Sequence, residues 1–453
     1  MHPLYDIVRK SLKTDAAQMT EEGHDKGALL AELEAAAAKH SLDALIALQQ
    51  DFWARPSPPD FPYEEPNDWE TIASFFPDPD THAEFRGTDK ELADRILAGW
   101  QGRCVGCQLG KPLEGTGRAD KIKKVLTAVG SWPLEDYMNP VPDGMDLEPV
   151  QDCAFFTRPY KNKLAKGNFR GMAPDDDIHY ALIGLHTLEK HGAAFTAEQA
   201  IDTLKTLAPA SCLYASGRNM FITSLFGIPA PQTALFNNPC RQSLGAMIRC
   251  DPFGWTAPGD PVLAADMAYR DAVGSQVRNG IYSGIFFAVL IADVFAHGDP
   301  VRAIDTAEQY VPPKSRFAEM VRFVKDACAR ESDWEKINAA LMAQPWHYVR
   351  EFNHALPNAA IVLTGLLKGG GDFTKTLGIT VMAGLDTDCT GATAGSIMGC
   401  ALGTAGIAGH WTEPLADTIH CELKGMCELK ISAVAERTFR VARTNARRDR
   451  SAE

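Results

Sequence analysis

Positive charge, long hydrophobic runs and alternating apolar patterns are all scarce in this 453-residue chain. Its 45 Lys and Arg against 58 Asp and Glu give a net charge of −13. Because a nucleic-acid groove needs a basic surface, nucleic acid is not an expected partner. The best membrane candidate, residues 391–409, is rich in Ala and Gly rather than Leu, so we interpret it as a close-packed core helix and expect no membrane partner. Regular strand patterns are rare, so the sequence predicts a mainly α-helical fold.

The cysteines do not form a disulfide pattern. Eleven of them, an odd number, are dispersed over the chain, which is typical of a reduced, cytoplasmic protein. The CxxC motif Cys104–Cys107 has no second CxxC or His pair at zinc-finger spacing, so we interpret its thiols as buried packing residues. No signal peptide is expected, because the N-terminus lacks a basic start followed by an apolar segment. Walker, Rossmann, HExxH and nucleophile-elbow motifs are also absent.

Helical spacing and proline content divide the chain into three parts. Residues 1–85 combine leucines at helical spacing with the Pro-rich segment 55–66, which predicts a helical N-terminal extension and a linker. A capping pattern at Thr88 then opens an apolar helix, and we assign residues 86–440 to the main domain. Residues 441–453 are rich in Arg and are expected to form a basic, solvated C-terminal tail.

Two acidic motifs about 210 residues apart each open a predicted helix: Pro174-Asp175-Asp176-Asp177 and Gly384-Leu385-Asp386-Thr387-Asp388. One aspartate in each could be a helix N-cap. Three consecutive like charges, however, repel one another unless a cation or solvent relieves them. Oxygen-only ligands are typical of Mg²⁺ and also suit Mn²⁺. The two motifs together therefore predict a site for one or two such ions between helices.

Two glycine stripes accompany these motifs. One consists of Gly391, Gly395, Gly399 and Gly403, and the other of Gly99, Gly102, Gly106 and Gly110. Each interior glycine costs a helix about 1 kcal/mol relative to alanine. Four on one face indicate that another backbone approaches closely, and we expect the two glycine helices to pack against each other.

Two further segments could contribute to a site. Glu114 lies in a Pro/Gly loop that could present its carboxylate to a cleft, although an exposed loop glutamate is an equal alternative. Segment 243–255 offers Ser243, Gly245, Arg249 and two aromatic residues. These suit a phosphorylated or aromatic ligand, and they equally suit ordinary packing.

In this order the four elements resemble the ADP-ribosylglycohydrolase family, which includes the dinitrogenase-reductase-activating glycohydrolases, over residues 88–440. The family's G-x-P-x-E loop is matched by residues 110–114, and its T-D-D-T motif falls on residues 175–178. Its S-N-G-x-x-x-R-x-x-P-x-G segment is matched by residues 243–254 with Leu244 in place of Asn, and its G-x-D-T-D-T motif falls on residues 384–389.

The resemblance implies an all-α fold, a compact orthogonal multi-helix bundle with two Mg²⁺ ions in a central cleft. It implies metal ligands at Asp176, Asp177, Asp386 and Asp388. Asp175 and Cys389 stand where the family usually has liganding threonines. Asp175 could still bind the metal. A thiol is a poor ligand for Mg²⁺, so either that ligand is lost or Thr390 replaces Cys389.

Segment 271–280 resembles a family stretch that has a histidine where Gln276 stands. The resemblance therefore implies that the substrate is bound by Ser243, Gly245, Arg249, Arg278, Asn279 and Gly280. The departures from the family pattern indicate a divergent subgroup.

The activity implied is Mg²⁺-dependent hydrolysis of a ribosyl N- or O-glycosidic bond. Glu114 would position or deprotonate water, with Asp177 and Asp386 as further catalytic carboxylates. The substrate would be an ADP-ribosylated protein or a small ribosylated molecule. The alternative is a non-catalytic ligand-binding or structural protein of the same fold, and a weaker alternative is an unrelated Mg²⁺ phosphohydrolase.

Overall fold

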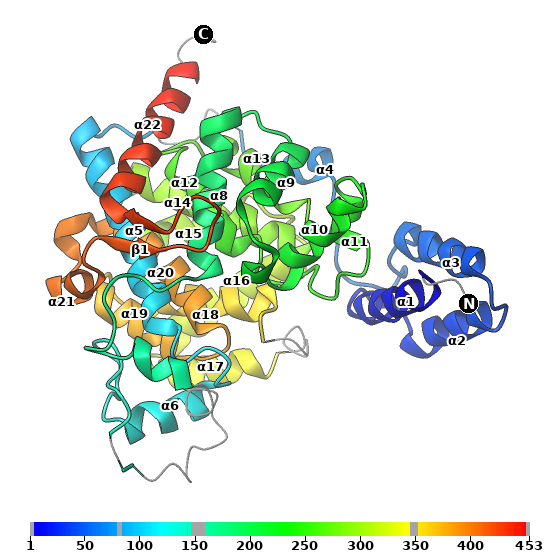
Figure 1. The fold of residues 1–453 in the computed structure, drawn as a ribbon, viewed down its shortest axis with the longest axis horizontal. Helices are drawn as coiled ribbons and strands as arrows, with labels where there is room; N and C mark the ends of the chain where they lie inside the picture. Colours follow the sequence, from blue (N-terminus) through cyan, green and yellow to red (C-terminus); the bar gives the residue numbers. More distant parts are fainter. Residues whose placement is uncertain (1–3, 79–83, 143, 146–158, 345–351, 450–453) are drawn as a thin grey trace.

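The computed structural model describes residues 4–78, 84–142, 144–145, 159–344 and 352–449 (Figure 1). Helices predominate in this part of the chain. The strands described are β1 (Thr418–His420) and β2 (Glu428–Lys430), which pair antiparallel with Ile419 opposite Leu429. The predicted all-α fold is therefore confirmed, with one short hairpin added.

The chain begins with three helices, α1 (Leu4–Glu21), α2 (Lys26–Ala37) and α3 (Leu42–Ala54), which lie at one end of the molecule (Figure 1). Their buried side chains form an apolar cluster separate from the main one, centred on Leu12, Leu33 and Leu45. The N-terminal extension thus has a small core of its own.

The other helices form the main body. They are α4 (Trp69–Ala73), α5 (Asp89–Gly110), α6 (Ala119–Ala128), α8 (Asp176–His191), α9 (Ala197–Leu207), α10 (Ala215–Leu225), α11 (Gln232–Leu235), α12 (Asp251–Trp255), α13 (Pro261–Ala272), α14 (Asn279–His297), α15 (Pro300–Glu308), α16 (Arg316–Arg330), α17 (Trp334–Met342), α18 (Ala355–Lys368), α19 (Phe373–Met382), α20 (Thr387–Leu402), α21 (Gly409–Thr412) and α22 (Ile431–Asp449). Short 3-10 helices are η3 (Pro159–Leu164), η4 (Ala210–Cys212), η5 (Met247–Arg249), η7 (Thr404–Gly406) and η8 (Glu413–Leu415).

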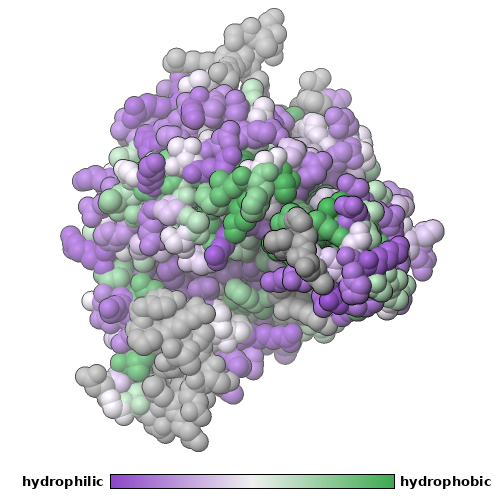
Figure 2. Space-filling view, turned by 45° about the vertical axis from the view of Figure 1, so that its right-hand side comes forward, coloured by the Kyte–Doolittle hydropathy of each residue, from purple (hydrophilic) through white to green (hydrophobic). Residues whose placement is uncertain are grey.

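The most apolar long helix is α14. Among the described residues it is the one helix long and apolar enough to cross a membrane, and 89% of that apolar window is buried inside the protein. We therefore interpret α14 as a core helix. Residues 391–409, the candidate chosen from the sequence, are largely taken up by α20, which is itself buried. The face shown in Figure 2 is mostly hydrophilic, with hydrophobic side chains gathered near its centre.

The two glycine stripes bring α5 and α20 into backbone contact. A Cβ atom added at Gly106 would lie 1.9 Å from the carbonyl oxygen of Gly391, and one added at Gly102 would lie 2.0 Å from that of Gly395. No side chain fits at these separations, so the predicted close approach of the two glycine helices is confirmed. Since α20 begins with the second acidic motif, this contact fixes where that motif lies relative to α5.

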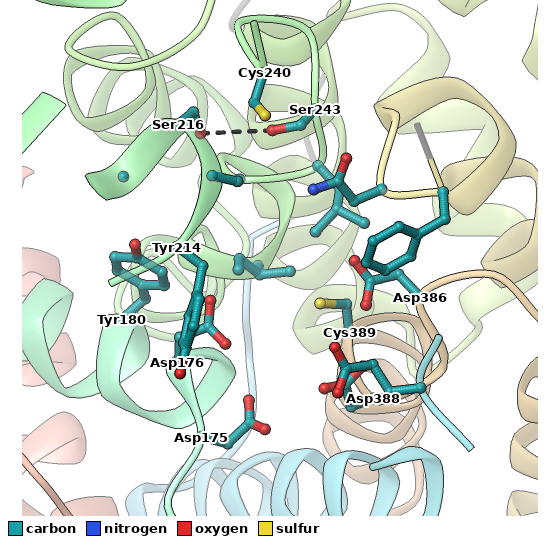
Figure 3. A pocket seen from close by; sticks show the side chains of 18 of the residues that line it. Asp175, Asp176, Tyr180, Tyr214, Ser216, Cys240, Ser243, Asp386, Asp388 and Cys389 are labelled. Atoms are coloured by element: carbon teal, nitrogen blue, oxygen red, sulfur yellow. Dashed lines mark hydrogen bonds between the residues drawn. The ribbon is translucent and has the colours of Figure 1, made fainter. Parts of the chain in front are cut away.

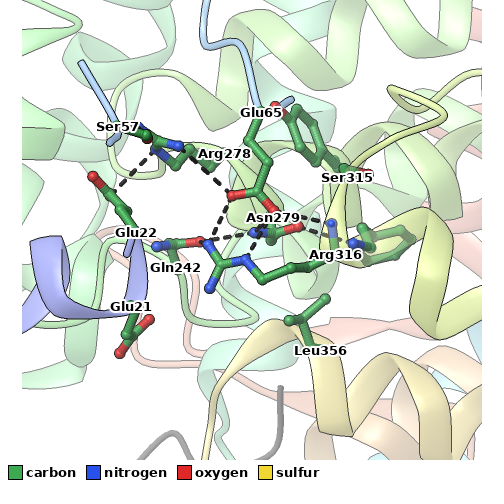
Figure 4. A network of polar contacts seen from close by, with 12 residues as sticks. Glu21, Glu22, Ser57, Glu65, Gln242, Arg278, Asn279, Ser315, Arg316 and Leu356 are labelled. Atoms are coloured by element: carbon green, nitrogen blue, oxygen red, sulfur yellow. Dashed lines mark hydrogen bonds and ion pairs between the residues drawn. The ribbon is translucent and has the colours of Figure 1, made fainter. Parts of the chain in front are cut away.

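The linker after α3 is tied to the main body by one buried carboxylate, Glu65 (Figure 4). It accepts hydrogen bonds from Arg316 Nε at 2.8 Å and Nη2 at 2.7 Å, and from Asn279 Nδ2 at 3.0 Å. Burial opposes its ionisation, but the hydrogen bonds and charge of Arg316 outweigh burial and lower the pKa of Glu65. The linker is therefore held by an internal ion pair.

The C-terminal helix differs from the expected tail. The boundary predicted at residue 440 lies inside α22, which continues to Asp449. Ala442 and Asn445 are buried, and Asn445 Nδ2 donates to the Thr256 carbonyl at 3.0 Å. The arginine content gave this segment the composition of a tail, but Ala442 and Asn445 pack on the core. Residues 450–453 lie outside the described residues.

Candidate metal centre and substrate cleft

Both acidic motifs line one cavity of about 710 Å³. Asp175 and Asp176 lie on one side of it, and Asp386, Asp388 and Cys389 lie on the other (Figure 3). The cavity is completed by Lys111, Glu114, Tyr180, Tyr214, Ala215, Ser216, Gly217, Cys240, Ser243, Leu244, Gly245, Ile248, Phe352 and Asn353.

Asp175 begins α8 as its N-cap. Its Oδ1 accepts a hydrogen bond from the Asp177 backbone at 2.9 Å, and its Oδ2 accepts one from Lys111 Nζ. Burial opposes ionisation of Asp175, but Lys111 outweighs it and lowers the pKa. Both carboxylate oxygens of Asp175 are thus engaged, whereas Asp176 lies half-buried at the cavity wall.

Asp177 lies behind the wall rather than on it. It is fully buried, and Arg103 of α5 donates to its carboxylate at 3.2 Å and its carbonyl at 2.7 Å. The same guanidinium donates to Asp251 at 2.7 Å. Sequence reasoning missed Arg103. The available signal was a lone cation inside the glycine stripe of α5, where a charge must find a buried partner.

The second wall is set by a tight turn before α20. Gly384 and Leu385 have φ angles of +89° and +63°, and Leu385 N donates to the Gly117 carbonyl at 2.9 Å. A left-handed non-glycine residue costs about 1–2 kcal/mol, which indicates that the surrounding structure enforces the turn. Asp386 then takes the N-cap position without accepting a capping hydrogen bond, so its carboxylate is available to the cavity.

The electrostatics of the second wall favour a bound cation. Burial, followed by the carboxylates of Glu114 and Asp175, raises the pKa of Asp388 to about 7. Burial and Asp388 likewise raise the pKa of Asp386. Oδ1 of Asp388 and Oδ2 of Asp177 are buried without a hydrogen-bond partner among the described residues. A divalent ion that binds such carboxyl groups displaces their protons into the solvent and offsets their mutual repulsion, so the donor set fits a divalent cation.

Glu114 and Lys111 reach the cavity from the turn that ends α5. The Glu114 backbone donates to the Gly110 carbonyl at 3.1 Å, which folds the loop back toward the cavity. Glu114 therefore lines the cavity. Of the two alternatives given for this loop, a carboxylate presented to a cleft and an exposed glutamate, the structure has the first.

Of the substrate-binding residues predicted in segment 243–255, two line the cavity. The Ser243 hydroxyl lies 3.5 Å from that of Ser216 (Figure 3), and a Cβ at Gly245 would lie 2.5 Å from the same Ser216 oxygen. Arg249 is buried beneath this wall, where its Nε donates to Asp271 at 2.6 Å. The structure does not bring Arg249 to the cavity surface.

Arg278, Asn279 and Gly280 do not line the cavity either. Arg278 Nε pairs with Glu22 at 3.2 Å, and Asn279 donates to Glu65 (Figure 4). A Cβ at Gly280 would meet the Gln276 side chain at 2.4 Å. Arg278 and Asn279 instead hold the N-terminal extension and its linker, because Glu22 and Glu65 supply carboxylates for them.

Thr390, predicted as a replacement metal ligand, is also placed elsewhere. Its hydroxyl donates to the Asp386 carbonyl at 3.0 Å, one helical turn back, and the residue does not line the cavity. Cys389 lines the cavity instead. Thr390 therefore does not take over the place of Cys389 as a possible metal ligand.

Sequence reasoning also missed the aromatic side chains of the cleft. Tyr180, Tyr214 and Phe352 line the cavity, and the last two are largely exposed there. They come from separate elements, so no local motif could have grouped them. Exposed rings at a cavity mouth suit a flat or apolar ligand moiety.

The N-terminal extension supports one cavity wall from behind. Asp15 of α1 pairs with buried Arg241 at 2.8 Å, and Ser11 Oγ accepts from the Asn237 backbone at 2.9 Å. Arg241 lies between Cys240 and Ser243 in sequence, and both of these line the cavity. The extension therefore contributes to the position of this wall.

Comparison with known proteins points to one enzyme family. The family model for ADP-ribosylglycohydrolase matches residues 88–447. The chain belongs to the ADP-ribosylglycohydrolase family. A solved structure described as "ADP-ribosylglycohydrolase-related protein complex" is similar at 18% identity and a TM-score of 0.48, covering 78% of this chain and 99% of that chain. No curated protein matches. Membership supports a metal-dependent enzyme of the glycosyl-hydrolase type that acts on ADP-ribosylated substrates.

Proposed function

We propose that this protein is a divalent-metal-dependent glycohydrolase that cleaves the ribosyl N- or O-glycosidic bond of an ADP-ribosylated protein or a small ribosylated molecule. One observation carries the proposal: two acidic motifs distant in sequence meet at a single cavity, where Asp388 has an unpartnered buried oxygen. Family membership of residues 88–447 supports the same reaction class.

Asp176, Asp386 and Asp388 are the carboxylates that would hold the metal. A bound divalent ion would act as a Lewis acid and an anchor for ribose hydroxyls. The cavity residues fit this role because Asp386 and Asp388 are buried next to each other and the pKa values of all three carboxyl groups are raised.

The chain's own residues supply the remaining chemistry. Glu114 positions a water at the anomeric carbon and accepts its proton as the new C–O bond forms. The glycosidic bond breaks, its electron pair stays with the leaving group, and that group takes up a proton. The surrounding carboxylates stabilise the positive charge that develops on the ribose ring. Ser216 and Ser243 offer hydroxyls to the substrate, and Tyr214 offers an aromatic face.

Hydrolysis followed by mass spectrometry tests the proposal. A panel of ADP-ribosyl-arginine, ADP-ribosyl-serine peptide, ADP-ribose derivatives and plain nucleosides is incubated with the protein, with divalent metal or with EDTA. We expect metal-dependent release of ADP-ribose or ribose, and a loss of at least about 100-fold in Asp386→Ala. Asp120→Ala, an exposed aspartate on α6, is the matched control. Full activity in Asp386→Ala would sink the proposal, and phosphate release would favour a phosphohydrolase instead.

A further inference from the structure

Two groups of acidic residues in the described part of the chain are close enough together to hold a metal ion, and each of the two includes a cysteine thiol. Cys107 has its sulfur within 4.8 Å of carboxylate oxygens of Asp175 and Asp177, and Cys389 has its sulfur within 4.8 Å of those of Asp386 and Asp388. The sequence led us to expect oxygen ligands alone. A sulfur donor changes which ions a site prefers, because thiolates favour softer metals than Mg²⁺.

The group around Cys107 already has two cations of its own. Lys111 pairs with Asp175, and Arg103 pairs with Asp177 at 3.2 Å. Arg103 and both aspartates are buried. A metal ion in this group would face an ammonium and a guanidinium at close range, and each of its carboxylates is already compensated. The positive charges of Lys111 and Arg103 therefore disfavour a metal ion in this group.

In the group around Cys389, the charge of Lys111 acts on Asp388 only through space, without an ion pair. Among the described residues, no cation forms an ion pair with Asp386 or Asp388. Asp388 is 4% exposed, and its Oδ1 has no hydrogen-bond partner in the described part of the chain. Cys389 is 6% exposed on the first turn of α20 and lines the cavity beside these carboxylates (Figure 3). Two carboxylates, one of which has an unpartnered buried oxygen, thus converge with one thiol at a place where no described cation forms an ion pair with them.

We propose that Asp386, Asp388 and Cys389 bind one thiophilic divalent ion per chain, of the Zn²⁺ or Co²⁺ class, and that Lys111 and Arg103 take the place of a second ion. As the sulfur–metal bond forms, the Sγ proton passes to the buffer. The inference rests on the proposed function for its role in hydrolysis, but its test requires no turnover. Carboxylate and thiolate ligands together are typical of zinc-like ions rather than Mg²⁺.

Cobalt binding to the full-length, chelator-treated protein tests the inference. Co²⁺ is titrated while the near-ultraviolet thiolate-to-cobalt charge-transfer band is recorded, and bound metal is counted by elemental analysis. We expect the band at one ion per chain. Cys389→Ser should lose the band and bind Zn²⁺ more than about 100-fold more weakly, a larger loss than an outer-shell change causes. Cys107→Ser, the matched thiol control, should keep the band.

Two ions per chain without a charge-transfer band in the wild-type protein would overturn the inference, and this result does not depend on any variant folding. Loss of the band in Cys107→Ser with retention in Cys389→Ser would assign the ion to the other group and also overturn it. Failure of the proposed function is a separate result: the cobalt band would be present, but no ribosylated compound would be hydrolysed. Mg²⁺-supported hydrolysis by a two-ion enzyme would instead uphold the function and refute the single thiophilic ion.

Discussion

The contact between α5 and α20 predicts that two glycine substitutions will destabilise the protein similarly but affect metal binding differently. A Cβ at Gly110 would lie 2.0 Å from the Thr387 carbonyl oxygen and 2.5 Å from the Asp388 nitrogen. A Cβ at Gly102 would lie 2.0 Å from the Gly395 carbonyl oxygen. The opposing atoms are backbone, so the helices must separate. We expect Gly110→Ala and Gly102→Ala each to lose about 3 kcal/mol, the upper part of the overpacking range.

Such a loss corresponds to a melting-temperature decrease of about 4 °C for a body of this size. Gly110 faces the backbone of Asp388, so separation at that end moves the carboxylate and Cys389 away from α5. Gly102 is eight residues earlier, about 12 Å along the helix. We therefore expect Gly110→Ala to weaken divalent-metal binding at least about tenfold, and Gly102→Ala to leave it close to that of the wild-type protein.

Thermal or denaturant unfolding measures the stability, and metal titration of the folded protein measures the affinity. Gly27→Ala in α2 is the control, because its added Cβ meets only the Asp25 carboxylate oxygen within 4 Å, at 3.2 Å. Alanine is the better helix former, so this variant should be neutral or slightly stabilised. Wild-type stability in both test variants, or equal losses of metal affinity in the two, would refute the reasoning.

The buried ion pairs of Arg103 and of Glu65 give the remaining predictions. Arg103→Met leaves Asp177 and Asp251 without their cation and should cost about 3–5 kcal/mol in denaturant unfolding; a loss below about 1 kcal/mol would contradict the assigned pairing. Glu65→Gln should destabilise the protein at neutral pH. Because Arg316 lowers the pKa of Glu65 in the folded state, its contribution is fully present above the unfolded pKa of about 4.3 and is lost as pH falls through the lower folded value. The stability gap between wild type and Glu65→Gln should therefore begin to narrow below about pH 4 and close once the pH is below the folded pKa, and a gap independent of pH would contradict this account.

Local signals made much of the site predictable. Thr88 accepts a hydrogen bond from the Glu91 backbone at 3.2 Å and starts α5, as its capping pattern indicated. Asp175 caps α8, which ends at Gly192 with a φ of +72°. Helix starts depend on residues within one turn, so sequence alone identifies them. The two glycine stripes carried longer-range information, since only close helix packing explains their regular spacing.

What the sequence did not reveal depends on partners far along the chain. Arg278 and Asn279 have side chains suited to a ligand. In the structure, however, Arg278 forms an ion pair with Glu22, and Asn279 donates a hydrogen bond to Glu65. Lys111 likewise neutralises the negative charge of Asp175, although the two residues are 64 positions apart in the sequence. A sequence motif identifies side chains that could bind a ligand. Which of these side chains are already paired with other residues depends on tertiary contacts, which the motif does not contain.

The measurement that tests the proposed activity most directly is hydrolysis of the ribosylated panel by chelator-treated protein with Mg²⁺, Mn²⁺ or Zn²⁺ added back. Release of ADP-ribose or ribose is expected only when a divalent ion is present, from the wild-type protein and Asp120→Ala but not from Asp386→Ala. Turnover that persists in EDTA, or no release of ribose or ADP-ribose from any compound by metal-loaded protein, would contradict a metal-dependent ribosyl hydrolase.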